Sequence, residues 1–344
     1  MNYKLLSVST EEQVNIGDYI QALASKQFLP HLDGFIQREE LKGYNEEECK
    51  VIMNGWYMHH PENWPPSNKI IPLYVAFHIN SLAKNQLLSD ESIDYLKKHE
   101  PIGCRDINTK NLLLEKGVKA YFSACMTLTL GYSYKSSNKE NKCYFVDPYI
   151  LYKHDIFKKI HNITYLLFHW KVISVIANKF PGKNSLLKKR IQASYFYKQY
   201  IIFFTKETLL NAEYISQQNK SYKTDLRNEY ERLEEAERLI KKYARAKLVV
   251  TSRIHCALPC LGLGVPVLYI ENTKQSEVSS CRLGGLKDLF NTISINENGY
   301  KTNFEFNRNK KISINSAPLN RESWIEYAKD LITTCKKFTS DDCQ

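Results

Sequence analysis

The stretch Lys247-Leu-Val-Val-Thr-Ser-Arg-Ile-His-Cys-Ala-Leu-Pro-Cys-Leu-Gly-Leu-Gly-Val-Pro-Val-Leu-Tyr-Ile270 decides the fold class of this chain. Its pattern predicts a buried strand, a polar turn, a helix and a second strand that is entered through Gly264-Val-Pro266. In an open parallel sheet such a turn lies at the edge where ligands bind. Arg253 and His255 therefore stand at the N-terminus of a helix, which itself favours anions.

Short apolar runs alternate with helical patterns on both sides of this stretch, which indicates an α/β fold. The 344 residues suffice for two layered domains of roughly 150 to 170 residues each. A polar segment rich in Ser, Asn and charge ends at Lys142 and is the best candidate for a linker. We expect a first domain over 1–134, a linker over 135–142, a second domain over 143–315, and a C-terminal helix and tail over 316–344.

The pattern predicts individual elements as well. The expected strands are Leu5–Val8, Cys49–Gly55, Leu73–His78, Pro101–Asp106, Val118–Phe122 and Cys143–Asp147. The expected helices are Asp18–Ser25, Ser89–Lys98, Asn108–Lys116, most of 155–215, and one amphipathic helix over Thr224–Ala246.

The chain is basic, with 48 Lys and Arg against 37 Asp and Glu and a formal net charge of +11. Such an excess attracts phosphorylated small molecules, anionic lipid or nucleic acid. The basic residues read as scattered, with dense runs only at Lys183–Arg190 and Lys241–Lys247, and no aromatic ladder is interleaved with them. We therefore expect no nucleic-acid partner, and at most a weak peripheral contact with an anionic membrane.

The nine cysteines are irregularly spaced, without a Cys-x-x-Cys pair or a zinc-like cluster, and we expect reduced thiols and no metal. The N-terminus is too poor in apolar residues for a signal peptide, and no stretch approaches the ~18 apolar residues of a membrane span. These features lead us to expect a cytoplasmic protein. If the protein contacts the membrane, we expect it to do so peripherally at the inner face.

Two turns in the first half carry polar side chains. In Asn15-Ile-Gly-Asp18, Gly17 lets a ligand approach closely, and Asp18 either caps the following helix or activates a hydroxyl. In Gly103-Cys-Arg-Asp106, Arg105 offers a fork for phosphate or carboxylate, or else forms a salt bridge that fixes the turn. The run Ser123–Leu130 either lines a cleft or is one buried strand.

In the second half, Arg253 and His255 are one residue apart, so both can face one pocket while Ser252 caps the helix. The alternative is a surface arginine beside a core histidine that a carbonyl satisfies. Because the flanking sequence is so apolar, two cationic side chains there favour an anion site. Among the other histidines, His78 ends an expected strand and can face the cleft, whereas His59 and its neighbour lie in a loop without ligand spacing.

Taken in order, these segments resemble the polysaccharide pyruvyl transferase family. The segments that carry the resemblance are Asn15-Ile-Gly-Asp18 with Gln21, Gly103-Cys-Arg-Asp106, Ser123-x-Cys-x-Thr-Leu-Thr-Leu130, Thr251-Ser-Arg-Ile-His255, Gly264-Val-Pro266 and Arg282-Leu-x-Gly-Leu286. The resemblance implies two Rossmann-like domains that face a cleft, similar to the B-type glycosyltransferase fold. The first domain is then the acceptor side and the second the donor side.

The resemblance also implies an enzyme that moves pyruvate from phosphoenolpyruvate onto sugar hydroxyls of a cell-surface glycan or exopolysaccharide, as a ketal, and releases phosphate. The partners are then phosphoenolpyruvate and an oligosaccharide or lipid-linked glycan, with no cofactor and no metal. On this view Arg253 and Arg105 bind the two anionic groups, with Ser252, Gly17 and Asn15 beside them. The catalytic candidates are His255, as general acid or phosphate ligand, and Asp18, which positions or deprotonates the acceptor.

Two other functions fit the same residues. A glycosyltransferase that uses a sugar nucleotide would bind a diphosphate at the helix N-terminus but also needs a pocket for the base. A non-catalytic protein that binds a glycan or an anion would keep Arg253 and His255 for binding alone.

Overall fold

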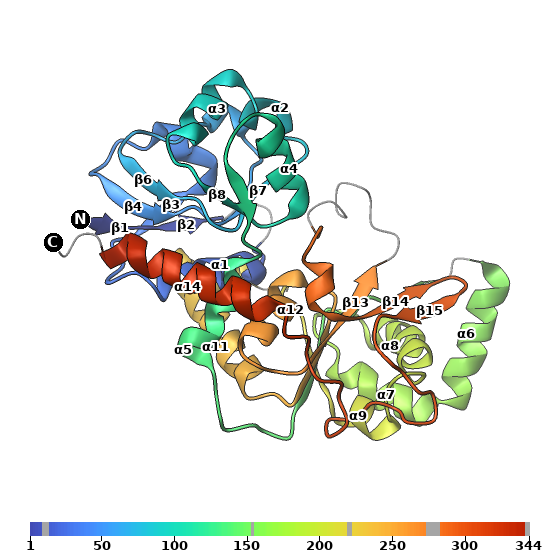
Figure 1. The fold of residues 1–344 in the computed structure, drawn as a ribbon. Helices are drawn as coiled ribbons and strands as arrows, with labels where there is room; N and C mark the ends of the chain where they lie inside the picture. The colour runs from blue at the N-terminus through green and yellow to red at the C-terminus, as the bar shows by residue number, and fades with distance from the viewer. Residues whose placement is uncertain (9–13, 153–154, 219–221, 273–282, 341–344) are drawn as a thin grey trace.

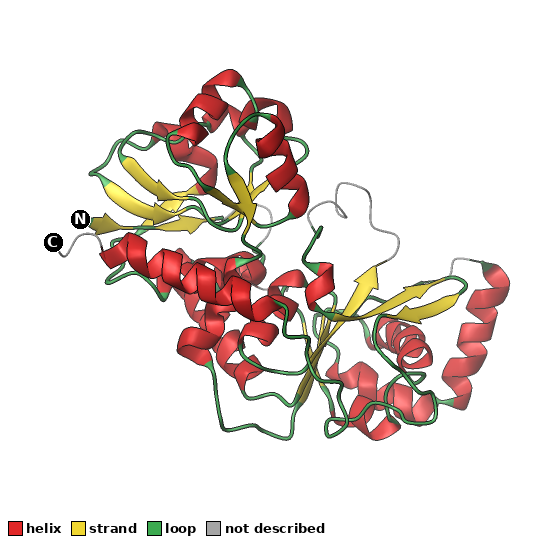
Figure 2. Cartoon of the chain, in the orientation of Figure 1, coloured by secondary structure: helices red, strands yellow, loops and turns green. Residues whose placement is uncertain are grey.

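The computed structural model describes residues 1–8, 14–152, 155–218, 222–272 and 283–340, and the chain forms a mixed α/β structure (Figures 1 and 2). In the described part of the first half, the strands form three parallel sheets. Their orders are β1(Asn2–Tyr3)-β4(Cys49–Ile52)-β6(Ile70–Leu73), β2(Leu5–Ser7)-β3(Phe35–Gln37), and β5(Gly55–Tyr57)-β7(Phe77–Ile79)-β8(Ile102–Cys104)-β9(Ala120–Phe122).

The strands described in the second half form one six-stranded sheet. Its order is β11(Glu213–Ile215)-β10(Cys143–Val146)-β12(Leu248–Thr251)-β13(Val267–Asn272)-β14(Asn291–Asn296)-β15(Gly299–Thr302), parallel except for the β14–β15 hairpin. Alternate side chains enter different cores: Tyr144 and Val146 face one side of the sheet, and Cys143 and Phe145 face the other. The sheet is therefore buried on both faces, as parallel sheets are.

Helices surround these sheets (Figure 2). The α-helices are α1(Ile16–Lys26), α2(Lys84–Leu87), α3(Asp90–Lys97), α4(Ile107–Glu115), α5(Gly131–Tyr134), α6(Ile156–Phe168), α7(Trp170–Lys179), α8(Leu186–Tyr200), α9(Lys206–Asn211), α10(Tyr222–Asp225), α11(Glu229–Ala244), α12(Ile254–Gly262) and α14(Trp324–Ser340). The 3-10 helices are η1(Arg38–Gly43), η2(Pro61–Asn63), η3(Met126–Leu130) and η4(Lys287–Leu289). Within the described ranges, the helices fall short of the length and apolarity that a membrane span needs.

Most expected elements are present, and three expectations are wrong. The strand expected over Leu73–His78 is divided into β6 and β7, because Ala76 has a φ of 52° and turns the chain between them. The segment Ser123–Leu130 is neither a strand nor a cleft wall, since most of it is the buried helix η3. The helical region 155–215 ends in strand β11, and the last helix before β12 begins only at Glu229.

A shared core joins the two halves. Helix α1 packs against α11, and η3 packs against α12 and α14. The backbones touch at Gly262, where an added Cβ would lie 2.2 Å from the Leu128 carbonyl oxygen. Helix α14 then runs back along the first half (Figure 1), where its Thr339 carbonyl accepts a hydrogen bond from the Tyr3 hydroxyl at 3.2 Å.

Candidate active site

A cavity of about 380 Å³ lies between the carboxyl ends of strands from both halves. All seven residues predicted for the site line it: Asn15, Gly17, Asp18, Arg105, Ser252, Arg253 and His255. The other lining residues are Val8, Arg38, Trp56, His59, Gln217, Gln218, Ile254, Tyr269, Leu283 and Leu286. Arg282, the first residue of the last expected motif, lies outside the described residues. The structure thus brings together turns that are up to 240 residues apart in the sequence.

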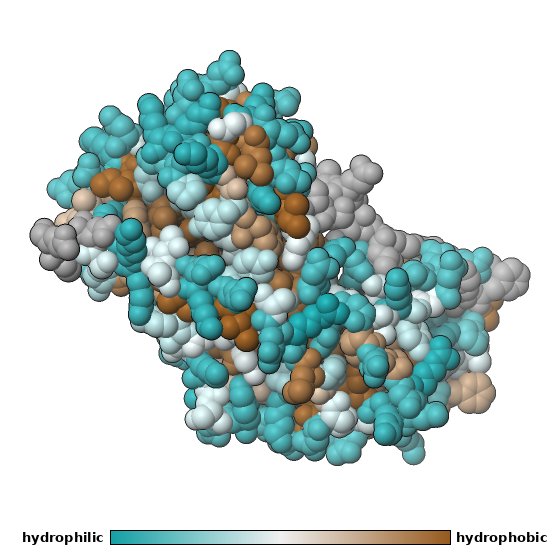
Figure 3. Space-filling view, viewed as in Figure 1, coloured by the Kyte–Doolittle hydropathy of each residue, from teal (hydrophilic) through white to brown (hydrophobic). Residues whose placement is uncertain are grey.

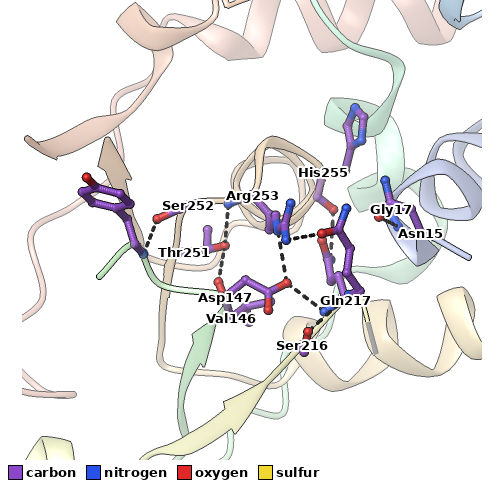
Figure 4. Close-up of polar contacts among 12 residues, drawn as sticks. Asn15, Gly17, Val146, Asp147, Ser216, Gln217, Thr251, Ser252, Arg253 and His255 are labelled. Atoms are coloured by element: carbon purple, nitrogen blue, oxygen red, sulfur yellow. Dashed lines mark hydrogen bonds and ion pairs between the residues drawn. The ribbon is translucent and has the colours of Figure 1, made fainter. Parts of the chain in front are cut away.

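The turn between β12 and α12 differs in one detail from the expectation. Arg253, not Ser252, is the N-cap residue of α12, and its backbone N–H donates to the Thr251 hydroxyl at 3.0 Å. The Ser252 hydroxyl instead accepts a hydrogen bond from the backbone N–H of Tyr149 at 2.6 Å. Ser252 therefore ties this turn to the loop after β10 (Figure 4), and the N-terminus of α12 has no side-chain cap.

The Arg253 guanidinium is held in place from two sides (Figure 4). Its Nε donates to the Asp147 carboxylate at 3.1 Å, and one Nη donates to the Gln218 side-chain oxygen at 2.6 Å. Asp147 also accepts a hydrogen bond from the backbone N–H of Gln217 at 2.9 Å. Its backbone has a φ of 40°, a conformation that residues other than glycine rarely adopt. Because a guanidinium has five N–H donors, this anchoring leaves Arg253 able to bind a ligand anion.

His255 lies where the first turn of α12 meets the first turn of α1. A Cβ added to Gly17 would lie 3.3 Å from the His255 Cβ and 3.4 Å from its Nδ1. In the structure, Gly17 therefore permits the close approach of the His255 side chain, whereas the sequence led us to expect the close approach of a ligand. The His255 backbone leaves helical geometry, with φ −82° and ψ 18°, and its carbonyl accepts from the Gln217 side chain at 3.4 Å.

Helix α1 begins differently from the expectation too. Asn15 is its N-cap and accepts from the Gly17 N–H at 3.1 Å, so Asp18 is not the cap. The Asp18 carboxylate accepts from the Asn15 side chain at 3.2 Å and from the Gln21 side chain at 3.1 Å. Two amides thus orient a half-buried carboxylate at the cavity, beside the N-terminus of a helix.

Arg105 extends the same network from the end of β8. It is only 4% exposed, and its Nη1 donates to the Gln21 side-chain oxygen at 3.5 Å. Asp106 is the N-cap of α4, and its carboxylate contacts His78 Nδ1 at 2.5 Å. Burial raises the pKa of Asp106, but the hydrogen bond from His78 and the nearby charges outweigh it and hold the pKa below its usual value. His78 is therefore a buried structural partner of Asp106, and the expectation that it faces the cleft is wrong.

Three lining residues from the first half, Arg38, Trp56 and His59, were missed by the sequence reasoning. The Arg38 guanidinium lies 4.9 Å from the centre of the Trp56 ring, which in turn lies 4.4 Å from the His59 ring. Glu39 accepts from Arg38 at 2.7 Å, and from the backbone N–H of His59 at 2.8 Å. Although burial raises the pKa of Glu39, the Arg38 charge and the backbone N–H groups lower it overall. The loop that carries His59, to which no role was assigned, is part of the site.

Basic side chains predominate in the lining of the cavity, which has three arginines and two histidines together with one carboxylate, Asp18. Asp147 and Glu39 compensate two of the arginines. The N-terminus of α12, which has no side-chain cap, lies at the same cavity and favours an anion further, whereas the first N–H groups of α1 donate to Gln217 and Asn15. In the part of the chain that the structure describes, no three of the side chains that bind metals come together. The arrangement is suited to a small ligand with more than one negative charge.

Comparison with protein families gives one clear result. The family model described as polysaccharide pyruvyl transferase matches residues 15–274, which is more than half of the chain. Compared with curated proteins and with solved structures, the chain has no significant match. The matched range begins at the N-cap of α1 and contains the seven expected site residues. The chain belongs to the polysaccharide pyruvyl transferase family.

Proposed function

We propose that this protein transfers pyruvate from phosphoenolpyruvate onto two hydroxyls of a sugar in a cell-surface or extracellular glycan, forming a ketal and releasing phosphate. The observation that carries the proposal is the cavity itself. Three arginines, two imidazoles and an oriented carboxylate surround a space of about 380 Å³, which is adequate for a small ligand with two anionic groups beside one sugar ring.

Phosphoenolpyruvate carries two anionic groups, and the cavity offers two differently held arginines for them. Arg253 is anchored by Asp147 and lies at the N-terminus of α12, where phosphate is favoured. Arg105 is almost fully buried, lines the cavity directly, and donates to the Gln21 side-chain oxygen. We assign phosphate to Arg253 and carboxylate to Arg105.

The reaction balances with the groups present. One acceptor hydroxyl adds to C2 of phosphoenolpyruvate, and the methylene carbon gains a proton and becomes a methyl group. The C–O bond to phosphate then breaks as the second hydroxyl adds to C2, and the proton of that hydroxyl leaves with phosphate. We assign the donation of the proton to carbon to His255 and the acceptance of the proton of the first attacking hydroxyl to Asp18, both of which line the cavity; the proton taken up by Asp18 then returns to His255 through solvent.

The acceptor sugar would lie against the wall formed by Arg38, Trp56 and His59. The Trp56 ring offers an apolar face, and the flanking guanidinium and imidazole offer hydrogen-bond donors. On this proposal the acceptor lies against the first half, and the donor binds by its phosphate to Arg253 of the second half and by its carboxylate to Arg105 of the first. We propose accordingly that the chain divides near residues 135–142 into two Rossmann-like domains of the B-type glycosyltransferase arrangement and acts in the cytoplasm.

The test supplies phosphoenolpyruvate with free and lipid-linked oligosaccharides and follows two products at once. The proposal requires phosphate release together with a pyruvyl mass increment on the glycan, in equal amounts. Sugar transfer from a sugar nucleotide would instead identify a glycosyltransferase. Phosphoenolpyruvate binding without turnover on any acceptor would leave a binding protein.

A further inference from the structure

The positive charge of the chain is concentrated in one segment, contrary to the scattered distribution expected from the sequence. Residues 156–206 contain ten Lys or Arg and no Asp or Glu. The other 293 residues carry 38 basic and 37 acidic side chains. Nearly all of the formal +11 therefore belongs to the segment that forms α6, α7 and α8, which lies at the end of the molecule farthest from β1–β9 (Figure 1).

The same segment exposes an unusual amount of apolar surface. Of the eighteen large apolar side chains that are exposed among the described residues, nine lie between residues 160 and 191. They are Ile160, Ile163, Leu167, Phe168, Trp170, Val175, Leu186, Leu187 and Ile191. Apolar side chains are also visible at the edge of the molecule where α6 lies (Figure 3). Clustered apolar exposure of this kind marks an interaction surface.

Helix α6 has two apolar faces. Its inner face packs on α8, with the Tyr165 ring 6.2 Å from the Tyr197 ring. Its outer face carries Ile160, Ile163 and Leu167 at the i, i+3, i+7 spacing of one helical stripe, and Leu167 is 65% exposed. The core therefore accounts for the inner face alone, and the outer face is available to a partner.

Three cations of the segment, Lys179, Lys189 and Arg190, contact uncharged groups. The Lys179 ammonium donates to the Leu210 carbonyl at 2.5 Å, and the Lys189 ammonium donates to the Phe180 carbonyl at 2.7 Å. The Arg190 guanidinium stacks 4.2 Å from the centre of the Trp170 ring, which is itself 42% exposed. Carbonyl groups and an aromatic ring carry no net negative charge, so these contacts leave the positive charge of the three side chains in place. This surface therefore attracts anionic partners.

We propose that the surface formed by α6, α7 and the start of α8, which we name the basic apolar face, docks on an anionic lipid bilayer. Apolar side chains beside lysines and a tryptophan are the composition of segments that lie in the membrane interface. A second copy of the chain does not fit, because it would bring a +10 segment against another +10 segment. A polyanion in water does not use the outer apolar stripe of α6.

The proposal is tested by sedimentation of the full chain with lipid vesicles. We expect binding to phosphatidylcholine vesicles that contain about 30 mol% phosphatidylglycerol and much weaker binding to phosphatidylcholine alone. Replacing Lys171, Lys183 and Lys188 by Gln should weaken binding about 100-fold, at roughly 5-fold per charge. The matched control, Lys84, Lys97 and Lys116→Gln, removes the same charge from exposed positions in the first half and should change binding less than about 3-fold.

A second pair of variants separates a bilayer from any other anionic partner. Replacing Ile163, Leu167 and Phe168 by Ser should weaken vesicle binding by roughly 100-fold, because these side chains enter the acyl boundary. The control replaces Leu82, Leu114 and Leu319, exposed elsewhere, by Ser and should bind as the unaltered chain does. Vesicle binding should also shift the tryptophan fluorescence to the blue, and Trp170→Phe should abolish that shift while sedimentation persists.

Three results would overturn the proposal: no binding to anionic vesicles, equal losses in the lysine variant and its control, or full binding by the apolar variant. Binding to RNA that depends on the lysines alone would assign the surface to nucleic acid instead. Concentration-dependent dimers that the apolar variant disrupts would assign it to a second copy. None of these measurements needs activity, so they stand apart from the proposed reaction.

Discussion

The cavity and the basic apolar face are both rich in cations, but they hold them in opposite ways. In the cavity Arg253 is fixed by Asp147 and Gln218, and Arg38 by Glu39. The segment that forms the basic apolar face contains no Asp or Glu, and there Lys189 binds a carbonyl and Arg190 stacks on a ring. Fixed donors recognise one anion in one orientation, whereas uncompensated charge attracts any anionic surface. Single substitutions in the cavity should therefore change ligand binding strongly. On the basic apolar face, the effect on membrane binding should depend on the total charge that is removed.

The largest effect is expected for Arg253→Ala. The change removes a charge-assisted fork and leaves the Asp147 carboxylate to repel an anion, so kcat/KM should fall on the order of 10³-fold. Phosphoenolpyruvate should also no longer raise Tm, because binding to the folded state is lost. Arg245→Ala, which removes an exposed arginine paired with Glu140, serves as the control and should keep both properties. An unchanged Tm shift in Arg253→Ala would place the anion elsewhere.

His255→Gln should have the next largest effect. Glutamine keeps polar contacts but donates no acidic proton, so kcat should fall on the order of 10²-fold while KM for phosphoenolpyruvate changes little. The control is His161→Gln, which alters an exposed histidine on α6. Steady-state kinetics of both variants measures these changes in kcat and KM. Full turnover by His255→Gln would show that His255 does not donate the proton.

Gly17→Ala tests how closely the two helix ends must meet. The new Cβ would lie 3.2 Å from the Asn15 side-chain oxygen and 3.3 Å from the His255 Cβ, so these groups must shift by a few tenths of an ångström. Turnover should fall roughly 5- to 10-fold, with Tm nearly unchanged because alanine favours the helix. Gly43→Ala, where an added Cβ meets nothing within 4 Å, should alter neither quantity.

Lowering the pH should have a smaller effect, which is a loss of hydrogen-exchange protection in the cavity wall but not on the basic apolar face. The folded-state pKa of Glu39 is lowered, so its contribution to stability is complete above its unfolded pKa and is lost as pH falls through the folded value. The amides of His59 and His60, which donate to Glu39, should lose several-fold in protection below about pH 4. Hydrogen exchange measured from about pH 6 to about pH 3 and corrected for intrinsic rates should show no local acid-sensitive loss in α8. Equal losses in both regions would contradict the assignment to Glu39.

The candidate site was largely visible in the sequence because its turns follow recognisable strands. The apolar run before Thr251 and the helical run after Ile254 place Arg253 and His255 at one edge without any structure. The caps were not predictable: Ser252 is drawn to Tyr149 by the neighbouring loop, and Asn15 displaces Asp18 as the cap. Both outcomes depend on tertiary contacts.

The missed residues have a different cause. Arg38 and His59 follow the three-residue strands β3 and β5, which are too short to show a period of two. Gln217 follows β11, whose sequence continues the pattern of the preceding helices, so that no strand was expected before it. The uneven charge was present in the sequence itself, and a running count over 156–206 would have found it.

The backbone conformation of Asp147 lowers the stability of the fold, while its side chain holds Arg253 in the cavity. An aspartate held at a φ of 40° destabilises the folded chain by about 1 kcal/mol or more relative to a glycine at the same place. Selection for thermal stability alone would therefore replace it, and the more robust protein would lose the anchor of Arg253. We therefore expect variants selected only for heat resistance to replace Asp147 early.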